Sequence, residues 1–355
     1  MNTFGNRFRI SVFGESHGPR VGVTIDGVLP GIPLCEEDFR EDLARRKAGA
    51  LGTTSRIETD LPEIVSGVFE GHTTGAPLTV LFRNENTRSE DYEGFREHPR
   101  PGQSDFTANL KFGGFNDPRG GGHFSGRITL GPVAAGVIAK KMLHFAQFHS
   151  RIVEVGGEKD AAKWPELLQA TQADGDSLGG VVECVVEGLP IGLGEPFWDS
   201  VESQIAHAVF AIPGVRGIEF GDGFQAARMK GSEHNDLFPE HRCHHDDPDH
   251  ECCHGGEGHE CRHDDLDHQC CHGEHEEGHH CCGRHKHIQP PVTNHAGGVN
   301  GGLTNGNALV FRVAFKPTSS IPKAGIQGRH DVCFALRCPV IVEAMAAIVL
   351  TDLAL

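Results

Sequence analysis

Residues 14–19 read Gly-Glu-Ser-His-Gly-Pro, and near the other end of the chain residues 328–331 read Gly-Arg-His-Asp. Both segments place charged or hydroxyl side chains beside glycines, which permit sharp turns. Four more segments share this character, at residues 100–105, 118–127, 294–302 and 316–320. A Gly-rich polar segment is often an ordinary loop. Six of them that together concentrate Arg, Lys, His and Asn favour a site for a multiply charged ligand.

Composition sets limits on what this chain of 355 residues does. Its 37% hydrophobic content supports a real core. The formal net charge of −17 argues against nucleic-acid binding, which needs a basic face. Residues 1–20 have no apolar stretch of signal-peptide type, and the most apolar stretch, residues 339–355, is too short to span a bilayer. We therefore expect a cytoplasmic protein that binds neither nucleic acid nor a membrane.

Composition also divides the chain into three regions, residues 1–232, 233–287 and 288–355. The middle region holds 15 His, 8 Cys and 15 Asp or Glu, and residues 243–254 repeat as residues 261–272. No apolar periodicity runs through it, so it cannot bury a core by itself. We interpret it as a flexible, low-complexity loop inserted between the first and last parts of one large domain.

The insertion presents thiolate and imidazole groups close together, and these ligands suit zinc, nickel or copper. Their spacing matches no defined zinc finger. Two alternatives stay open, a disordered tract that binds metal opportunistically and an ordered metal site. The candidate ligands are His245, Cys252, Cys253, His254, His263, Cys270, Cys271, His272, Cys281 and Cys282.

Hydrophobic periodicity predicts mixed α and β structure. Strand-like patterns occur at residues 8–13, 22–28, 62–69, 77–82, 180–187 and 308–315. Helices are expected at residues 36–47, 202–210 and 340–353, and residues 131–148 give the clearest amphipathic pattern. Strands in adjacent pairs, separated by helices, indicate an α+β layered fold.

The six polar segments occur in the order found in chorismate synthases, and the chain resembles that family over residues 1–232 and 288–355. The resemblance implies a β-α-β sandwich, with helices between sheets, and a homotetramer. It also implies the last step of the shikimate pathway, which serves aromatic amino-acid biosynthesis. In that step 5-enolpyruvylshikimate 3-phosphate loses phosphate by 1,4-anti elimination and becomes chorismate.

The reaction of this family needs reduced FMN although it has no net redox change. No dinucleotide-binding motif is present in the sequence, so we expect a separate flavin reductase to supply the reduced FMN. The resemblance also implies an association with NADP. A catalytic metal is not expected, because nothing in the elimination needs one.

The resemblance also implies roles for individual residues. His17 would protonate the departing phosphate, and Asp331 would lie close to the reactive edge of the flavin. The substrate-binding residues would be Arg45, Arg46, Arg127 and Arg329. The cofactor-binding residues would be Ser125, Arg127, Asn294, Ala296, Lys316, Thr318, Ser320 and Arg329.

One departure from the family touches the mechanism. Residues 100–105 read Arg-Pro-Gly-Gln-Ser-Asp, and Gln103 stands where the family usually has a histidine associated with protonating reduced flavin. A Gln side chain donates a hydrogen bond but cannot transfer a proton in this pH range. We therefore predict weakened flavin protonation, or a substitute such as His98 or His123. Gln103 and the insertion keep two alternatives open, a metal-storage or metal-delivery protein on a retained enzyme scaffold and a flavin-binding paralogue with another phosphorylated substrate.

Overall fold

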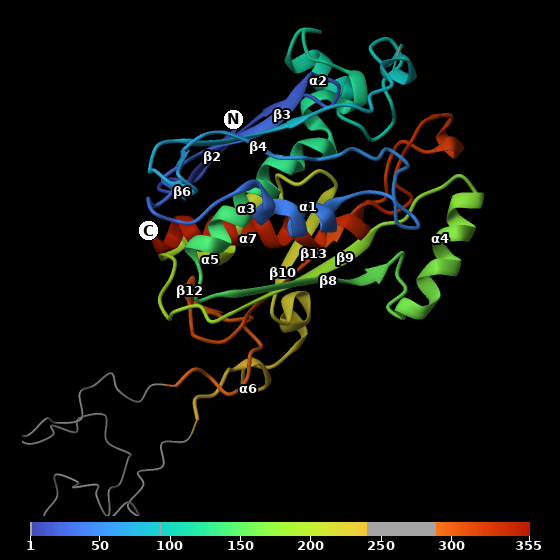
Figure 1. Ribbon diagram of the computed structural model, residues 1–355. Helices are drawn as coiled ribbons and strands as arrows, with labels where there is room; N and C mark the ends of the chain where they lie inside the picture. The colour runs from blue at the N-terminus through green and yellow to red at the C-terminus, as the bar shows by residue number, and fades with distance from the viewer. Residues whose placement is uncertain (1, 93, 240–288) are drawn as a thin grey trace, which may run out of the picture.

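Two antiparallel sheets enclose a layer of helices in the computed structural model, which describes residues 2–92, 94–239 and 289–355 (Figure 1). The first sheet has the order β1 (Thr3–Phe4), β2 (Arg9–Gly14), β3 (Arg20–Asp26), β7 (Leu78–Arg83), β4 (Glu63–Ser66). The second has the order β10 (Val215–Phe220), β13 (Leu309–Phe315), β9 (Gly180–Glu187), β8 (Gln147–Val155). The predicted ranges coincide to within a few residues with β2, β3, β4, β7, β9 and β13, whereas β1, β8 and β10 were not predicted.

Two long helices, α3 (Leu130–Met142) and α7 (Pro339–Ala354), pack against each other between the sheets (Figure 1). Helix α3 contacts β2 and β3 of the first sheet, and α7 contacts β8 and β9 of the second. A Cβ atom on Gly136 would lie 2.5 Å from the Cβ atom of Ala344, so the glycine permits the close approach of the two helices. The arrangement confirms the expected β-α-β sandwich.

Helix α3 differs from the amphipathic helix predicted at residues 131–148. It ends at Met142, and every residue from Leu130 to Ala139 is buried. Because a helix between two sheets has no face toward water, its apolar positions surround it on all sides. The predicted range ran on into β8, where polar and apolar residues alternate as they do in a half-buried strand.

The remaining elements lie around this sandwich. The helices are α1 (Arg40–Arg46), α2 (Asp105–Lys111), α4 (Trp164–Ala173), α5 (Val201–Val209) and α6 (Gly231–His234). Two small hairpins pair β5 (Val68–Phe69) with β6 (His72–Thr73) and β11 (Val299–Asn300) with β12 (Leu303–Thr304). Helices α1 and α5 confirm the predictions at residues 36–47 and 202–210, and a short 3-10 turn at Glu36–Phe39 precedes α1.

The His/Cys-rich insertion falls mostly outside the described residues, and so do all ten of its candidate metal ligands. Its first residues do belong to the described part, where the Asp236 carboxylate accepts hydrogen bonds from the backbone N–H groups of His295 and Ala296 at 2.8 and 2.9 Å. The described residues contain no group of three or more His, Cys, Asp or Glu side chains placed to hold a metal ion. No helix within them is long and apolar enough to cross a membrane.

Candidate active site

A cavity of about 720 Å³ opens among the loops that lead into α3 and α7. Four of the six polar segments line it, namely residues 100–105, 118–127, 316–320 and 328–331. Residues 14–19 lie directly behind this wall, because a Cβ atom on the cavity residue Gly120 would lie 2.6 Å from the ring of His17. The volume is within the range of sites for small molecules and cofactors.

The cavity has a strong excess of positive charge. Among the described residues that line it, nine are Lys or Arg and three are Asp or Glu. The cations are Arg46, Lys47, Arg56, Arg100, Arg127, Arg216, Lys316, Arg329 and Arg337, and the anions are Glu58, Asp60 and Asp331. Because guanidinium groups pair with carboxylates and phosphates at two points, this lining suits a ligand or ligands with several anionic groups.

Asp60 is shared by two buried arginines in the cavity wall. Its Oδ2 atom lies 3.3 Å from Nη1 of Arg46, and its Oδ1 atom pairs with Nη1 of Arg127. Arg127 also donates from Nε to Oδ1 of Asn84 at 2.8 Å. Burial, followed by the positive charge of Arg337, lowers the pKa of Arg46 to about 9. One carboxylate thus holds two guanidinium groups in place without neutralising both.

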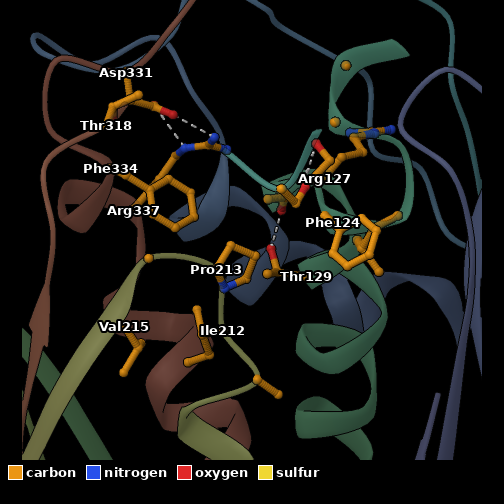
Figure 2. Close-up of a pocket in the computed structure, with 18 of the residues that line it drawn as sticks. Phe124, Arg127, Thr129, Ile212, Pro213, Val215, Thr318, Asp331, Phe334 and Arg337 are labelled. Carbon is orange, nitrogen blue, oxygen red and sulfur yellow. Dashed lines mark hydrogen bonds and ion pairs between the residues drawn. The ribbon is translucent and has the colours of Figure 1, made fainter. Parts of the chain in front are cut away.

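Asp331 is held in place by Arg337, as Figure 2 shows. Nε and Nη2 of Arg337 donate to Oδ1 and Oδ2 of Asp331 at 3.0 and 2.9 Å. Oδ1 also accepts from the backbone N–H of Thr54 at 2.9 Å. The guanidinium lies 5.0 Å from the centre of the Phe334 ring. Both carboxylate oxygens of Asp331 therefore act as hydrogen-bond acceptors.

His17 lies just behind the cavity wall and is 8% exposed. Its Nδ1 atom is 3.1 Å from Oγ of Ser89, and its ring meets the edge of Tyr92 with 5.1 Å between ring centres. Burial, and then the positive charges of Arg56, Arg119 and Arg329, lower its pKa to about 4, although Asp117 acts in the opposite direction. At neutral pH the imidazole of the ligand-free protein is therefore uncharged.

The other side of the cavity has features that fit a flavin. Figure 2 shows Phe124, Pro213, Val215 and Phe334 around one region, which gives apolar surface for a planar ring. The hydroxyl oxygen of Thr318 is buried and has no hydrogen-bond partner in the described part of the chain. A buried polar atom of this kind requires a partner, and a bound ligand would supply it.

Gln103 lies on the turn that contributes to this flavin-like side. Its Nε2 atom donates to Oγ of Ser320 at 3.1 Å, and both residues line the cavity. Arg100 stabilises the turn, since its Nε and Nη2 atoms each lie 2.8 Å from a carboxylate oxygen of Asp105. Lys316 reaches across to the carbonyl of Gly102 at 3.1 Å, and burial lowers the pKa of this lysine.

Most residues predicted for the site lie at this one cavity. The structure places there Arg46, Gln103, Ser125, Arg127, Lys316, Thr318, Ser320, Arg329 and Asp331. His123, one of the two suggested substitutes for the missing histidine, also lines the cavity. His98, the other, is exposed and does not contribute to the lining.

The structure does not bring Arg45, Asn294 or Ala296 to the cavity lining. Successive residues of a helix differ in direction by about 100°, so Arg45 points away from Arg46 and pairs with the buried Glu343 at 2.7 Å. Asn294 and Ala296 lie beside Gly221 at the far end of β10, whereas the cavity touches the start of that strand at Val215.

Several cavity residues were not predicted from the sequence. Glu58, Asp60, Arg216 and Arg337 all lie outside the six polar segments. Of these four, Arg337 could have been suspected from the sequence, because it lies shortly after Asp331, in the 3-10 turn Phe334–Arg337. Asp60 gave no signal, since its partners come from α1 and from the loop before α3.

Comparison with known proteins gives the family. The chorismate synthase family model matches residues 8–355. This chain belongs to the chorismate synthase family. It is 55% identical to the chorismate synthase of Chitinophaga pinensis over 99% of this chain and 96% of that protein. It is 38% identical to the chorismate synthase of Dehalococcoides mccartyi over 100% of this chain and 96% of that protein.

A solved structure described as the crystal structure of chorismate synthase matches 99% of this chain and 92% of its own, with a TM-score of 0.66. Its sequence is 24% identical, so this match supports the fold alone. Membership of the family makes the chain a phosphate-eliminating lyase of the shikimate pathway. These comparisons support neither a metal-storage protein nor a flavin-binding paralogue with another substrate.

Proposed function

We propose that the cavity binds 5-enolpyruvylshikimate 3-phosphate together with reduced FMN and converts the substrate to chorismate by 1,4-anti elimination of phosphate. The observation that carries this proposal is the excess of cations in one cavity that also has an apolar wall. The substrate has carboxylates and a phosphate, and FMN adds a second phosphate. The cavity therefore combines the charge and the aromatic surface that this pair of ligands requires.

The arginines would hold the anionic groups of the substrate. Arg46 and Arg127 are already held in place by Asp60, so little side-chain entropy is lost when an anion binds to them. Arg329 is oriented by Asn86, whose Oδ1 atom accepts from Nη1 at 3.0 Å. Preorganised cations of this kind act on charge that develops as the phosphate departs.

His17 would donate a proton to the departing phosphate. In the ligand-free protein it is uncharged at neutral pH, because burial and the neighbouring arginines lower its pKa. A bound phosphate offsets the charges of Arg56, Arg119 and Arg329 and raises the proton affinity of the imidazole. His17 therefore becomes an acid only when substrate is present, which prevents loss of the proton to water beforehand.

The flavin side of the cavity would use Thr318, Ser320, Lys316 and Gln103 to bind reduced FMN, with Asp331 close to them. When bound, reduced FMN supplies electron density as phosphate departs and recovers it as the C6 hydrogen is lost. The side chain of Gln103 is oriented by the hydrogen bond that it donates to Ser320, but it cannot transfer a proton. His123 is the cavity residue that could supply one in its place.

The test is phosphate release measured anaerobically with the substrate and reduced FMN. We expect release by the full-length protein, and we expect Arg329→Gln to lower kcat/KM by on the order of 10- to 100-fold, the value of a charged hydrogen bond. The control is Arg151→Gln, since that side chain is 75% exposed and lies outside the cavity. Equal losses in both variants would contradict the assigned site.

Four further features are part of this proposal: a homotetramer, a cytoplasmic location, a separate flavin reductase, and NADP as an associated nucleotide. The resemblance of the sequence to this family suggests the tetramer and NADP, and the absence of a dinucleotide-binding motif from the sequence suggests the reductase. For the His/Cys-rich insertion we propose an accessory role, with binding of zinc, nickel or copper. Deletion of residues 240–288 retains Asp236 and its contacts, and it should leave phosphate release intact while abolishing metal uptake. A loss of phosphate release in a folded deletion variant would overturn the accessory role.

A further inference from the structure

The hydroxyl of Ser89 is the hydrogen-bond partner of His17. Its Oγ atom lies 3.1 Å from the Nδ1 atom of the imidazole ring. Ser89 and Tyr92 belong to one short 3-10 turn, Ser89–Tyr92, and the edge-to-face contact of Tyr92 with His17 comes from the same turn. This turn lies outside the six polar segments, and its Tyr92 also lines the cavity.

The opposite edge of the imidazole ring faces Gly120. A Cβ atom on that residue would lie 2.6 Å from Cδ2 and 2.8 Å from Nε2 of His17, so only a glycine fits there. Gly120 lines the cavity. The ring is therefore held between Ser89 at Nδ1 and the cavity residue Gly120, which has no side chain, at Nε2.

We propose that Ser89 is a positioning residue that accepts a hydrogen bond from Nδ1–H of His17, so that Nε2 is the atom that gains and loses the catalytic proton. This inference rests on the proposed role of His17. In the step itself, the C–O bond to phosphate breaks and its electron pair goes to the phosphate oxygen. The ring double bond shifts to the carbon that has lost phosphate, and the electron pair of the C6–H bond forms the second double bond as that hydrogen leaves as a proton. The Nε2 proton passes to the phosphate, and His17 returns to its neutral form with the remaining proton on Nδ1.

The hydrogen bond matters because the two nitrogens of a neutral imidazole differ, one being a donor and the other an acceptor. Proton transfer from Nε2 always leaves the Nδ1–H tautomer. Ser89 stabilises that tautomer and keeps the ring from rotating. Arg56, Arg119, Arg329 and Asp117 also act on His17 through their charges, whereas Ser89 makes a hydrogen bond to one particular ring nitrogen, Nδ1.

The direct test is the tautomer of His17 in 15N-labelled full-length protein, measured by NMR at pH 7 and assigned by the signal lost in His17→Gln. We expect the Nδ1–H tautomer in the wild type and in Ser89→Thr, and a shift toward Nε2–H in Ser89→Ala. The control Ser66→Ala removes an exposed serine whose hydroxyl donates to the carbonyl of Pro77 at 2.9 Å. It should change nothing. An Nε2–H tautomer in the wild type, or no change in Ser89→Ala, would overturn the proposal.

The kinetic test uses the same variants. We expect Ser89→Ala to lower kcat about tenfold, a part of the usual contribution of a general acid, with KM for the substrate unchanged and activity restored in Ser89→Thr. An unchanged kcat, or an equal loss in Ser66→Ala, would contradict the role of Ser89. If the wild type releases no phosphate, the proposed function fails instead, and the tautomer measurement still decides whether Ser89 orients His17.

Discussion

Arg337 binds Asp331 at two points, with Nε and Nη2 lying 3.0 and 2.9 Å from the two carboxylate oxygens. The side chains are 13% and 10% exposed, so the pair is largely removed from water. Phe334 lies against the guanidinium and limits its movement. The position of Asp331 in the cavity therefore depends on an arginine that follows it by one turn.

Arg337→Gln should destabilise the protein, because it leaves a nearly buried carboxylate without its cation. Breaking a buried ion pair in this way costs about 3 kcal/mol. The free energy of unfolding in urea measures the effect. Arg151→Gln provides the comparison, since its pair with Glu183 is exposed and should contribute less than about 1 kcal/mol. Similar losses in the two variants would show that the Arg337–Asp331 pair is no more important than a surface pair.

The pKa of His17 should rise when an anion enters the cavity. It is lowered to about 4 in the ligand-free protein, by burial and by Arg56, Arg119 and Arg329. Inorganic phosphate should raise it by about one unit or more, the usual effect of an opposite charge nearby. NMR titration of the His17 ring with and without phosphate measures this. A pKa near the ordinary 6.5 in the ligand-free protein would contradict the account.

The same lowered pKa affects stability. Because the folded-state pKa is below the ordinary value of 6.5, the unfolded chain binds more protons between pH 6.5 and 4. His17 therefore reduces stability as the pH falls through this window. In His17→Gln the free energy of unfolding should depend less on pH there, whereas the two proteins should show the same pH dependence between pH 7 and 8. Parallel curves across the lower window would rule out this contribution.

Gln103→His should raise turnover. It supplies an imidazole on the turn that lines the flavin side of the cavity, where the present side chain only donates to Ser320. Turnover should rise about tenfold. This is less than the usual contribution of a general acid, because His123 already acts as a partial substitute. Turnover at neutral pH with saturating reduced FMN measures it, and Gln103→Asn is the control. If turnover stays the same or falls, flavin protonation is not weakened in this chain.

Gly120→Ala should abolish most activity. Its backbone has φ of +60°, and the new Cβ atom would lie 2.6 to 2.8 Å from ring atoms of His17. Gly31→Ala is a matched control, because its φ of +85° is also positive but no atom lies within 4 Å of the added Cβ. The control should lose only about 1 kcal/mol of stability, the ordinary cost of left-handed backbone, and keep its activity. Equal kcat values in the two variants would show that space beside His17 is unimportant.

Sequence patterns predicted the parts of this molecule that depend on local order. The strands β9 and β13 alternate in burial along their length, and both lie where they were expected. Helix α3 was misjudged because its surroundings, a sheet on one side and α7 on the other, cannot be seen in its own residues. The end of the helix and the start of β8 were merged for the same reason.

The sequence indicated those cavity residues that belong to a polar segment. It did not indicate those whose role depends on an ion pair formed by the fold. Arg127, Lys316 and Asp331 lie in polar segments that resemble the family, and all three line the cavity. Asp60 and Arg337 have no such mark, since each is defined by a partner that the fold brings near. Arg45 and Arg46 are adjacent in sequence but point in different directions, so a motif alone does not tell which one faces the cavity.

The proposed function requires that this cavity eliminate phosphate from 5-enolpyruvylshikimate 3-phosphate without consuming reduced FMN. The most direct measurement follows phosphate, chorismate and the flavin absorbance together in one anaerobic reaction of the full-length protein. We expect equal amounts of phosphate and chorismate, with the flavin still reduced at the end. Phosphate without chorismate, oxidation of flavin in proportion to product, or no release of phosphate would contradict it.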